Sequence, residues 1–297
     1  MKILVTGGAG FIGRHLVDAL VAERKDIRVL DNLRRAIRPD PAGCYHFIEG
    51  DIRDRVTVEK AMEGVDVVFH LAAQSNVTGA MVDPDYSFTT NVGGTYEVLR
   101  AAKAAGVGRV VFASSREVYG DAETLPVSES APLRPKNGYG ESKVAGEAYC
   151  RAFSGKGLEV NILRLANVYG PGDRDRVIPI FLENAAQGRP LRINGGQQVI
   201  DFIWVGTVVT ALRAAAFGPV LPGPVNIGSG EGTTLMELTG KVLALTGAKV
   251  DIEMATSRSF ETVKFVADVR QAERLLGIAR QDEPLFHLSA MLPVVVA

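Results

Sequence analysis

One glycine-rich segment near the start of this chain constrains its fold more than any other feature. Thr6-Gly-Gly-Ala-Gly-Phe-Ile-Gly13 lies between a short β-branched run and a longer helix-like pattern. At such a strand-to-helix turn, one glycine makes the tight turn, a second lets the backbone approach a pyrophosphate, and a third lets the helix pack closely on the strand. The amides at the helix start would then face the phosphates. We therefore predict a dinucleotide site that is held by Gly7, Gly10, Phe11, Ile12 and Gly13.

The first two-thirds of the chain alternates short apolar runs with longer helix-like segments. This alternation is typical of a parallel sheet that is covered by helices on both faces. Right-handed crossovers then give an α/β, doubly wound parallel sheet, the Rossmann fold. The expected strands are Ile3–Thr6, Ile27–Asp31, His46–Ile48, Val65–His70, Arg109–Ser114 and Val160–Leu165. The expected helices are Phe11–Glu23, Asp54–Glu63, Phe88–Ala105 and Tyr139–Phe153.

After about Asn167 the pattern loosens, and the elements become shorter. Prolines stand at 171, 179, 190, 219, 222 and 224. We therefore expect a smaller and less regular C-terminal portion. The predicted organisation is a dinucleotide-binding domain over residues 1–166 and a substrate-binding domain over residues 167–297, the two being interleaved.

An acidic residue at the end of the second expected strand indicates which dinucleotide binds. Asp31 lies close to the ~20 residues beyond the glycine loop at which a carboxylate contacts the adenosine ribose. A carboxylate would repel a 2′-phosphate, so the sequence favours NAD over NADP. Arg34 and Arg35 follow closely and could pair with such a phosphate, which leaves NADP as the alternative. Asn32 is predicted to bind the cofactor as well.

Two further segments are expected at the same edge of the sheet. Asp51-Ile52 follows the third expected strand, and Leu71-Ala72-Ala73 follows the fourth. Ligands of open α/β sheets collect at the carboxyl ends of the strands. We therefore predict that these five residues contact the cofactor.

Tyr139-Gly-Glu-Ser-Lys143 places a phenol and an ammonium one turn apart on one face of a helix. A cation so close favours the phenolate and would lower the pKa of the tyrosine toward the working range of a general base. Ser115 follows an expected strand at the same sheet edge, where its hydroxyl could donate to the substrate oxygen. The alternative is an ordinary tyrosine–lysine pair on a solvated helix. The order of these residues after a dinucleotide loop favours the catalytic interpretation.

From Met1 to about Gly277 the chain resembles the extended short-chain dehydrogenases/reductases, specifically the NAD-dependent nucleotide-sugar epimerases and dehydratases. The matching segments are Thr6–Gly13, His70–Ala73, Asn91 with Gly94-Thr95, Ser114–Gly120, Tyr139–Lys143, Asn167–Pro171 and Asn226–Gly230.

This resemblance implies a reaction and a role for each catalytic residue. Tyr139 takes the proton from the C4 hydroxyl of the sugar, and Ser115 shares that hydrogen bond. Lys143 holds the cofactor ribose, and NAD accepts the hydride. An epimerase then returns the hydride to the other face of the 4-keto sugar.

The resemblance also implies binding residues and an assembly. Asn91 is placed among the cofactor-binding residues, and Asn167 on the substrate diphosphate. Arg258 and Glu261 fall on a late loop around the nucleotide, with Glu261 replacing a more usual aspartate. A homodimer built from the helices that start near Phe88 and Tyr139 is implied as well.

Before Gly277 the chain departs from the family pattern at two places. Dehydratases of this family usually have Asp-Glu after the catalytic hydroxyl residue, and here Arg116 and Glu117 stand there. Glu117 could still remove a proton or assist an elimination or a decarboxylation; the alternative is a structural ion pair with Arg116 or another base. Ile200 replaces an arginine that usually contacts the diphosphate, a charge-assisted bond worth roughly 1.5–3 kcal/mol.

Composition narrows the remaining classes. The formal net charge is −1, and basic and acidic residues are interspersed, so nucleic acid is not an expected partner. No apolar run approaches the ~18 residues of a membrane helix, and the start of the chain does not have the pattern of a signal peptide. We therefore expect a cytoplasmic protein in which Cys44 and Cys150 are reduced.

These observations give one favoured function and three alternatives. The favoured function is NAD-dependent C4 epimerisation of a nucleotide-activated sugar, without a metal. The first alternative is a dehydratase or decarboxylase that uses Glu117 after the same oxidation. A reductase that consumes its cofactor and a cofactor-binding sensor without catalysis follow, but a sensor would not need Ser115, Tyr139 and Lys143.

Overall fold

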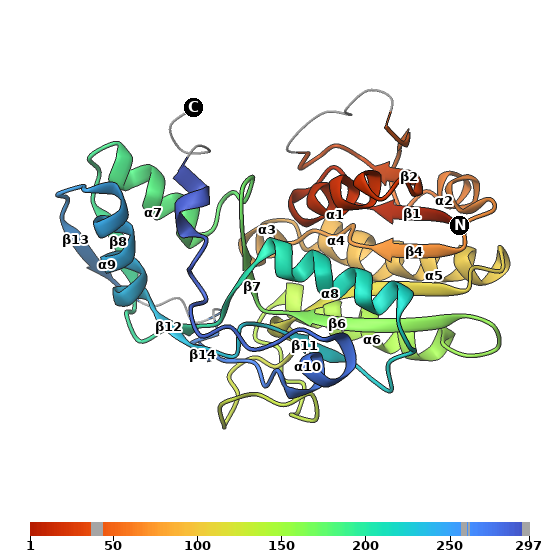
Figure 1. Ribbon diagram of the computed structural model, residues 1–297. Helices are drawn as coiled ribbons and strands as arrows, with labels where there is room; N and C mark the ends of the chain where they lie inside the picture. Colours follow the sequence, from red (N-terminus) through yellow and green to blue (C-terminus); the bar gives the residue numbers. More distant parts are fainter. Residues whose placement is uncertain (37–43, 257–259, 261, 293–297) are drawn as a thin grey trace.

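The computed structural model describes residues 1–36, 44–256, 260 and 262–292, and a seven-stranded parallel sheet is its largest element (Figure 1). The strand order is β11-β6-β5-β4-β1-β2-β3. It reverses next to β1, and ligands of open α/β sheets bind at such a reversal. The predicted doubly wound fold is therefore confirmed. The strands are β1 (Lys2–Thr6), β2 (Asp26–Asp31), β3 (His46–Glu49), β4 (Val67–His70), β5 (Arg109–Ser115), β6 (Glu159–Leu165) and β11 (Val225–Ile227).

The sheet has a hydrophobic core on each face. Successive side chains of a strand point to opposite faces; Ile3 and Val5 belong to one core, and Leu4 between them belongs to the other. The first core is covered by α1 (Phe11–Ala22) and α8 (Val205–Phe217). The second is covered by α2 (Arg55–Met62), α5 (Thr95–Ala104) and α6 (Gly138–Phe153).

The helix predicted over Phe88–Ala105 is present, but its first part is a π-helical turn and two short helices precede it. The chain forms α3 (Val77–Val82), α4 (Pro84–Phe88), a π-helical turn η1 (Thr89–Gly94) and then α5. A Cβ on Gly94 would lie 2.5 Å from Cδ1 of Ile52. The glycine therefore lets this wider turn pack directly against the residue after Asp51.

The part of the chain beyond Leu165 forms a second lobe and also returns to the large sheet. The lobe has its own core, to which Tyr169, Phe181 and Leu238 contribute. Its elements are β7 (Asn167–Tyr169), α7 (Val177–Ala186), β8 (Leu191–Asn194), β9 (Val199–Ile200), β10 (Phe202–Trp204), β12 (Thr233–Thr234), α9 (Leu235–Thr246), β13 (Ile252–Ala255), β14 (Lys264–Phe265) and η3 (Leu288–Met291). Between them, β11 joins the edge of the large sheet and α10 (Arg270–Leu276) packs beside it.

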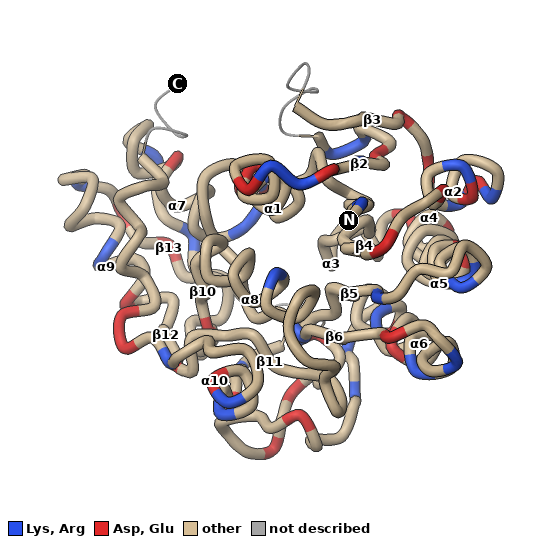
Figure 2. Tube along the Cα trace, turned by 45° about the vertical axis from the view of Figure 1, so that its right-hand side comes forward, with Lys and Arg blue, Asp and Glu red and all other residues tan. Residues whose placement is uncertain are grey.

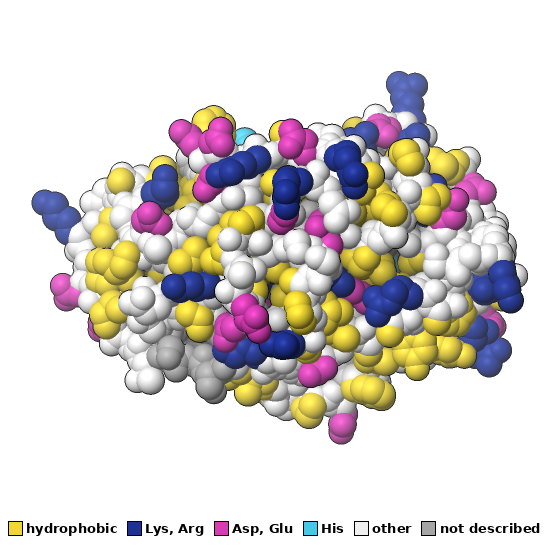
Figure 3. All heavy atoms as spheres, turned by 90° about the horizontal axis from the view of Figure 1, so that it is seen from below, with side chains coloured by type: hydrophobic (Ala, Val, Ile, Leu, Met, Phe, Trp, Pro, Cys, Tyr) yellow, Lys and Arg dark blue, Asp and Glu magenta, His cyan; other side chains and the backbone are white. Residues whose placement is uncertain are grey.

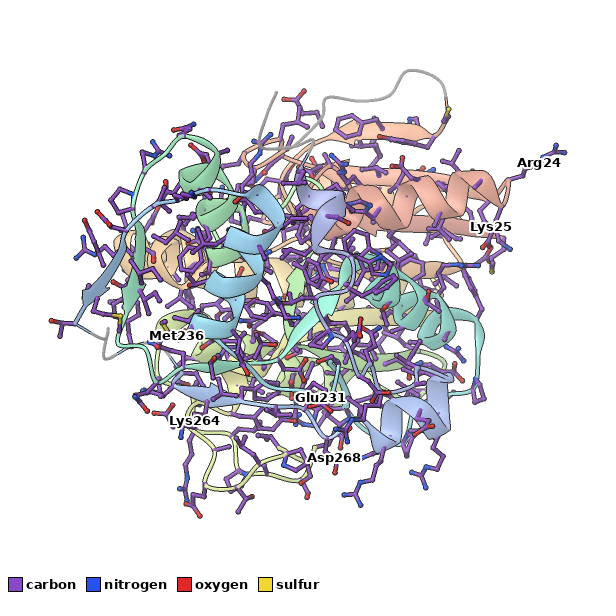
Figure 4. All side chains as sticks on the ribbon, turned by 60° about the vertical axis from the view of Figure 1, so that its left-hand side comes forward. Arg24, Lys25, Glu231, Met236, Lys264 and Asp268 are labelled. Atoms are coloured by element: carbon purple, nitrogen blue, oxygen red, sulfur yellow. The ribbon has the colours of Figure 1, made fainter. Side chains whose placement is uncertain are left out.

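The carboxyl ends of the parallel strands face this second lobe (Figure 1). Arg24 and Lys25 precede β2 and lie on the opposite side of the molecule from Met236 of α9 (Figure 4). The edge where ligands are expected therefore lies between the sheet and the lobe. Basic and acidic residues are interspersed along α2, α5 and α6 (Figure 2) and on the face seen from below (Figure 3).

Candidate active site

The glycine loop between β1 and α1 is shaped by close approach of the backbone. Gly7 has a φ of +73°, and a Cβ there would lie 2.6 Å from the backbone N of Ala72. A Cβ on Gly13 would lie 2.1 Å from the carbonyl oxygen of Gly7. Only glycine fits these positions. Gly10 caps α1 without a side chain, so the amides that start at Phe11 and Ile12 face outward from a helix N-terminus that suits a pyrophosphate.

Asp31 ends β2 directly beside this loop. Its Oδ2 accepts a hydrogen bond from the backbone N of Ala9 at 3.0 Å, and its Oδ1 accepts one from Leu33 at 2.8 Å. Burial raises the pKa of Asp31, although both backbone bonds lower it. The carboxyl group thus joins the end of β2 to the glycine loop, at the place where a ribose carboxylate is expected.

Asn32 and Asp51 are brought together at the ends of β2 and β3. The Asn32 amide donates to Asp51 Oδ2 at 3.0 Å, and Arg53 donates to both oxygens of the same carboxylate. Burial alone would raise the pKa of Asp51, but the hydrogen bonds from Arg53 and Asn32 lower it to about 2. Asp51 is therefore an anion at neutral pH.

Arg34 and Arg35, the two arginines that left NADP as the alternative cofactor, have partners within the protein. The Arg34 guanidinium lies 3.7 Å from the ring centroid of Tyr86 and 3.6 Å from Asp83. Arg35 forms an ion pair with Asp175 at 2.9 Å. A 2′-phosphate would have to compete with these contacts and with Asp31, so the arrangement favours NAD.

The loop after β4 lies against the glycine loop. Leu71 N donates to the carbonyl oxygen of Thr6 at 3.1 Å, and Ala72 packs on Gly7; Ala73 follows it. Asn91, which was expected at the cofactor, is buried in η1. Its side chain binds the backbone of Gln74 and donates to Ser142 Oγ at 2.9 Å. Asn91 therefore fixes the loop after β4 to α6.

Tyr139 and Ser115 meet across the site. Tyr139 lies in the first turn of α6, and Ser115, the last residue of β5, is close enough for its hydroxyl to lower the pKa of the tyrosine. Both side chains are largely buried. The structure thus brings together the phenol and the strand-end hydroxyl that the sequence predicted as neighbours.

The prediction that Lys143 lowers the pKa of Tyr139 was wrong. Burial raises the pKa of Tyr139 to about 12, and Arg176, the Ser115 hydroxyl and Arg116 only partly oppose this rise. The Lys143 ammonium donates to the carbonyl oxygen of Ala113 at 2.8 Å and lies 5.8 Å from the tyrosine ring centroid. Its own pKa falls to about 8 because it is buried. Lys143 lies on the predicted helix face, but its charge is directed at β5.

Glu117 forms the structural ion pair that the sequence left open. Its Oε1 lies 2.7 Å from Arg116 Nη2, while its Oε2 accepts from Asn137 at 3.0 Å and from Thr262 at 3.3 Å. Arg116 also donates from Nε to the side-chain oxygen of Asn167 at 2.9 Å. Both carboxylate oxygens of Glu117 are thus engaged, and Arg116 links Glu117 to the residue expected at the diphosphate.

Arg176 is a site residue that the sequence reasoning missed. It immediately precedes α7, its guanidinium lies 5.6 Å from the ring centroid of Phe11, and it pairs with the buried Asp173 at 2.7 Å. It also lowers the pKa of Tyr139. The i,i+3 spacing of an acid and a base before an apolar helix was visible in the sequence, but nothing local connects it to Tyr139.

The other residues expected at the nucleotide are placed only in part. Ile200 ends β9 and pairs with Thr233 of β12 and Phe265 of β14. Arg258 and Glu261 lie outside the described residues, so their predicted role stays a prediction.

Three general observations complete the site. Within residues 1–36, 44–256, 260 and 262–292, no helix is long and apolar enough to cross a membrane. No cluster of three or more histidine, cysteine or acidic side chains suited to a metal ion occurs in the described part of the chain. Cys44 is exposed and Cys150 is buried, and both are free.

A doubly wound sheet with a glycine loop after β1, and with serine, tyrosine and lysine at its carboxyl edge, defines a short-chain dehydrogenase/reductase. The chain belongs to the NAD dependent epimerase/dehydratase family, whose model matches residues 3–228.

Curated relatives cover nearly the whole chain and differ in their reactions. The chain is 37% identical over 282 residues to a putative UDP-glucose 4-epimerase of Methanocaldococcus jannaschii, with 92% of each chain covered. It is 36% identical over 294 residues to the UDP-glucose 4-epimerase of Mycolicibacterium smegmatis, with 93% of each covered. It is also 31% identical to UDP-glucuronic acid decarboxylase 1 of Xenopus tropicalis, covering 93% of this chain and 68% of that protein.

Solved structures show the same fold. UDP-glucose 4-epimerase of Thermotoga maritima, solved with UDP-glucose, superposes with a TM-score of 0.93 at 31% identity, covering 99% of this chain and 98% of that one. MoeE5, solved with UDP-glucose and NAD, gives 0.90 at 34% identity with the same coverage. An NDP-hexosamine 5,6-dehydratase gives 0.89 at 33% identity, covering 99% and 96%. The family thus includes epimerases, dehydratases and decarboxylases.

The cofactor is NAD, and the residues present fit it. The glycine loop keeps its tight turn before α1 only because Gly7 and Gly13 lack a Cβ. Asp31 lies beside that loop, and Arg34 and Arg35 are paired elsewhere. This chain is therefore an enzyme of an NAD-dependent family that acts on nucleotide sugars.

Proposed function

We propose that this protein epimerises a nucleotide-activated sugar at C4 through a 4-keto intermediate. The observation that carries the proposal is the placement of Tyr139 and Ser115 together at the carboxyl edge of the sheet, where both side chains are largely buried. The pair can hold a sugar hydroxyl by two oxygens and remove its proton through one of them. NAD, when bound, accepts the hydride from C4 and returns it.

The chain's own residues divide the remaining work. Tyr139 is the general base, and Ser115 orients the sugar oxygen. Lys143 holds the cofactor ribose, because its buried ammonium lies beside Ala113 at the end of β5. Arg176 and Arg116 stabilise the phenolate, because both lower the pKa of Tyr139. Asn167, next to Arg116, contacts the diphosphate; Arg258 and Glu261 are proposed to surround the nucleotide.

The engagement of Glu117 favours epimerisation over the alternatives. A dehydratase or decarboxylase would need a free acid or base here, whereas Arg116, Asn137 and Thr262 bind both oxygens of Glu117. The elimination alternative remains as an outcome of the test, because Glu117 is close enough to Tyr139 to raise its pKa.

Product analysis tests the proposal directly. The purified protein is incubated with UDP-, dTDP- and GDP-sugars without an added reductant, beginning with UDP-glucose because the relatives act on it or bind it. A product of unchanged mass that is a new sugar isomer supports epimerisation. Loss of one water assigns dehydration, and loss of carbon dioxide assigns decarboxylation. Accumulation of NADH identifies net oxidation, and no turnover with NAD retained identifies the sensor.

We further propose a homodimer in the cytoplasm, with the division at residue 166 separating the cofactor-binding from the sugar-binding part. Phe88, Tyr96 and Tyr149 are exposed on α4, α5 and α6, and the rings of Tyr96 and Tyr149 lie 5.6 Å apart, so a second copy could pack there. Sedimentation equilibrium measures the state. A monomer at micromolar concentration would contradict this assembly without affecting the assigned reaction.

A further inference from the structure

A buried carboxylate lies one helical turn beyond Lys143. Glu147 and Lys143 are four residues apart on α6, and Glu147 is fully buried. A buried charge is tolerated only when it is paired and hydrogen bonded. The proposed reaction assigns no step to Glu147.

Glu147 has one partner on its own helix, Arg151, whose Nη1 lies 3.5 Å from Oε2, and its other partners come from β5 and β6. Arg164 of β6 binds it with two parallel hydrogen bonds, Nε to Oε1 at 2.8 Å and Nη2 to Oε2 at 2.7 Å. Ser114 of β5 donates to Oε1 at 2.6 Å. Ser114 precedes Ser115, so this bond ties α6, which carries Tyr139, to the strand end that carries the tyrosine's partner.

The network continues toward β11. Arg164 Nη1 donates to the Tyr119 hydroxyl at 2.8 Å, and that hydroxyl donates to Asn226 Oδ1 at 2.7 Å. Arg164 also donates to the carbonyl oxygen of Glu129 at 3.0 Å. The pair therefore joins α6 to three strands and to the segment after β5 that carries Glu117.

Glu147 is also one of the titratable groups around Lys143, because it lies one turn further along the same helix. These neighbours are His70 on β4, Cys150 and Glu147 on α6, and Tyr139. Burial lowers the pKa of His70 to about 3 and raises that of Cys150, so both are neutral at pH 7. Burial lowers the pKa of Lys143 to about 8, and Cys150 and Glu147 oppose this shift. Of those two, Glu147 is the one that a guanidinium binds with two hydrogen bonds.

We propose that Glu147, held by Arg164, is a positioning residue for the catalytic side chains. It fixes α6 against the end of β5 and supplies the charge that keeps Lys143 in its ammonium form. The inference rests on the proposed function of Tyr139 and Lys143, and it adds a device that sets the upper pH limit of their activity.

The test compares kcat of the wild type and Glu147→Gln between pH 6 and pH 8.5. Removing a nearby opposite charge lowers the pKa of a cation by about one unit or more. The ratio of wild-type to variant kcat should therefore rise about fivefold from pH 6 to pH 8, while KM for the sugar changes less than about threefold. A role in folding alone would lower kcat by the same factor at every pH, and a constant ratio would overturn the proposal.

Two further variants act as controls. Glu141→Gln removes an exposed carboxylate from the same helix and should leave the pH profile unchanged. Glu147→Asp keeps the charge and should therefore restore most of the kcat that Glu147→Gln loses at alkaline pH. If Glu147→Gln does not fold, Glu147→Leu with Arg164→Met removes both buried charges, a replacement that proteins often tolerate. In this double variant kcat should also fall at a lower pH than in the wild type. An unchanged pH profile would count against the proposal.

A measurement without substrate separates this inference from the assigned reaction. Since the pKa of Lys143 is lower in the folded chain than in the unfolded one, this group binds more protons in the unfolded state above pH 8, and its contribution to the free energy of unfolding rises with pH there. This rise should begin at a lower pH in Glu147→Gln and be absent when Lys143→Met is added. An unshifted rise overturns the inference even if turnover is found, and a shifted rise supports it even if no sugar is turned over.

Discussion

The two sides of the candidate site are held in different ways. On the cofactor side, the shape depends on backbone contacts that exclude a Cβ at Gly7 and Gly13. On the substrate side, it depends on charged side chains that are partly buried and paired, namely Arg116 with Glu117 and Arg176 with Asp173.

This difference predicts different sensitivities. A backbone cradle should tolerate changes of pH but no added atom. A wall of buried ion pairs should tolerate small changes of shape but respond to pH and to loss of charge, because an unpaired buried charge is costly. Tyr139 lies at the junction, because its ring is on α6 while Arg176, Ser115 and Arg116 lower its pKa.

The largest effect is expected for Tyr139→Phe, which separates the two sides. Removing the hydroxyl removes the general base, whose contribution is typically about 10²–10⁴-fold in rate. The cradle is untouched, so NAD binding should remain within about twofold of the wild type. Single-turnover assays and fluorescence titration with NADH measure the two quantities. Retained turnover would remove Tyr139 as the base, and lost cofactor binding would show that the two sides are not separable.

Gly13→Ala tests the cradle. The new Cβ would lie 2.1 Å from the carbonyl oxygen of Gly7, a backbone atom that cannot move without displacing the loop. We expect loss of NAD binding and about 1–3 kcal/mol lower free energy of unfolding, as for other overpacked sites. Calorimetric titration and urea unfolding measure both. Gly240→Ala on α9 is the matched control, because a Cβ there meets nothing within 4 Å. Wild-type NAD affinity in Gly13→Ala would refute the backbone-cradle description.

The cofactor side was also the more predictable side. The glycine loop and Asp31 are local signals, and the alternation of apolar runs fixes the strands that place them. Tyr139 and Lys143 were correctly assigned to one helix face. Whether the ammonium points at the phenol or at Ala113 depends on how α6 packs on β5, and the i,i+4 spacing is the same in both cases.

The substrate side depends on contacts between residues far apart in the sequence. Arg176 reaches Tyr139 only because α7 belongs to a lobe that folds over the sheet edge. The three-residue strand β11 is too short for a periodic signal, and it enters the sheet through pairing with β6. The sequence favoured neither a free nor a paired carboxyl group for Glu117, because it does not show that Asn137 and Thr262 lie beside it.

The smallest of these effects concerns Asp173, the buried acid of the substrate side. Burial raises the pKa of Asp173 to about 6, although Arg176 lowers it. The folded state therefore binds more protons than the unfolded state between about pH 4 and pH 6, so the free energy of unfolding contributed by this group falls as pH rises through that window. We compare the free energy of unfolding of the wild type with that of Asp173→Asn. The difference, wild type minus variant, should be roughly 1–3 kcal/mol larger at pH 4.5 than at pH 7.5. Urea unfolding at both pH values measures this difference.

Asp175→Asn removes an exposed carboxylate from the same turn; an equal difference there would assign the effect to the net charge of the turn. A difference of opposite sign would mean that Arg176 stabilises Asp173 as the anion. The paired charges of the substrate side would then give no more stability at acidic pH than surface charges do.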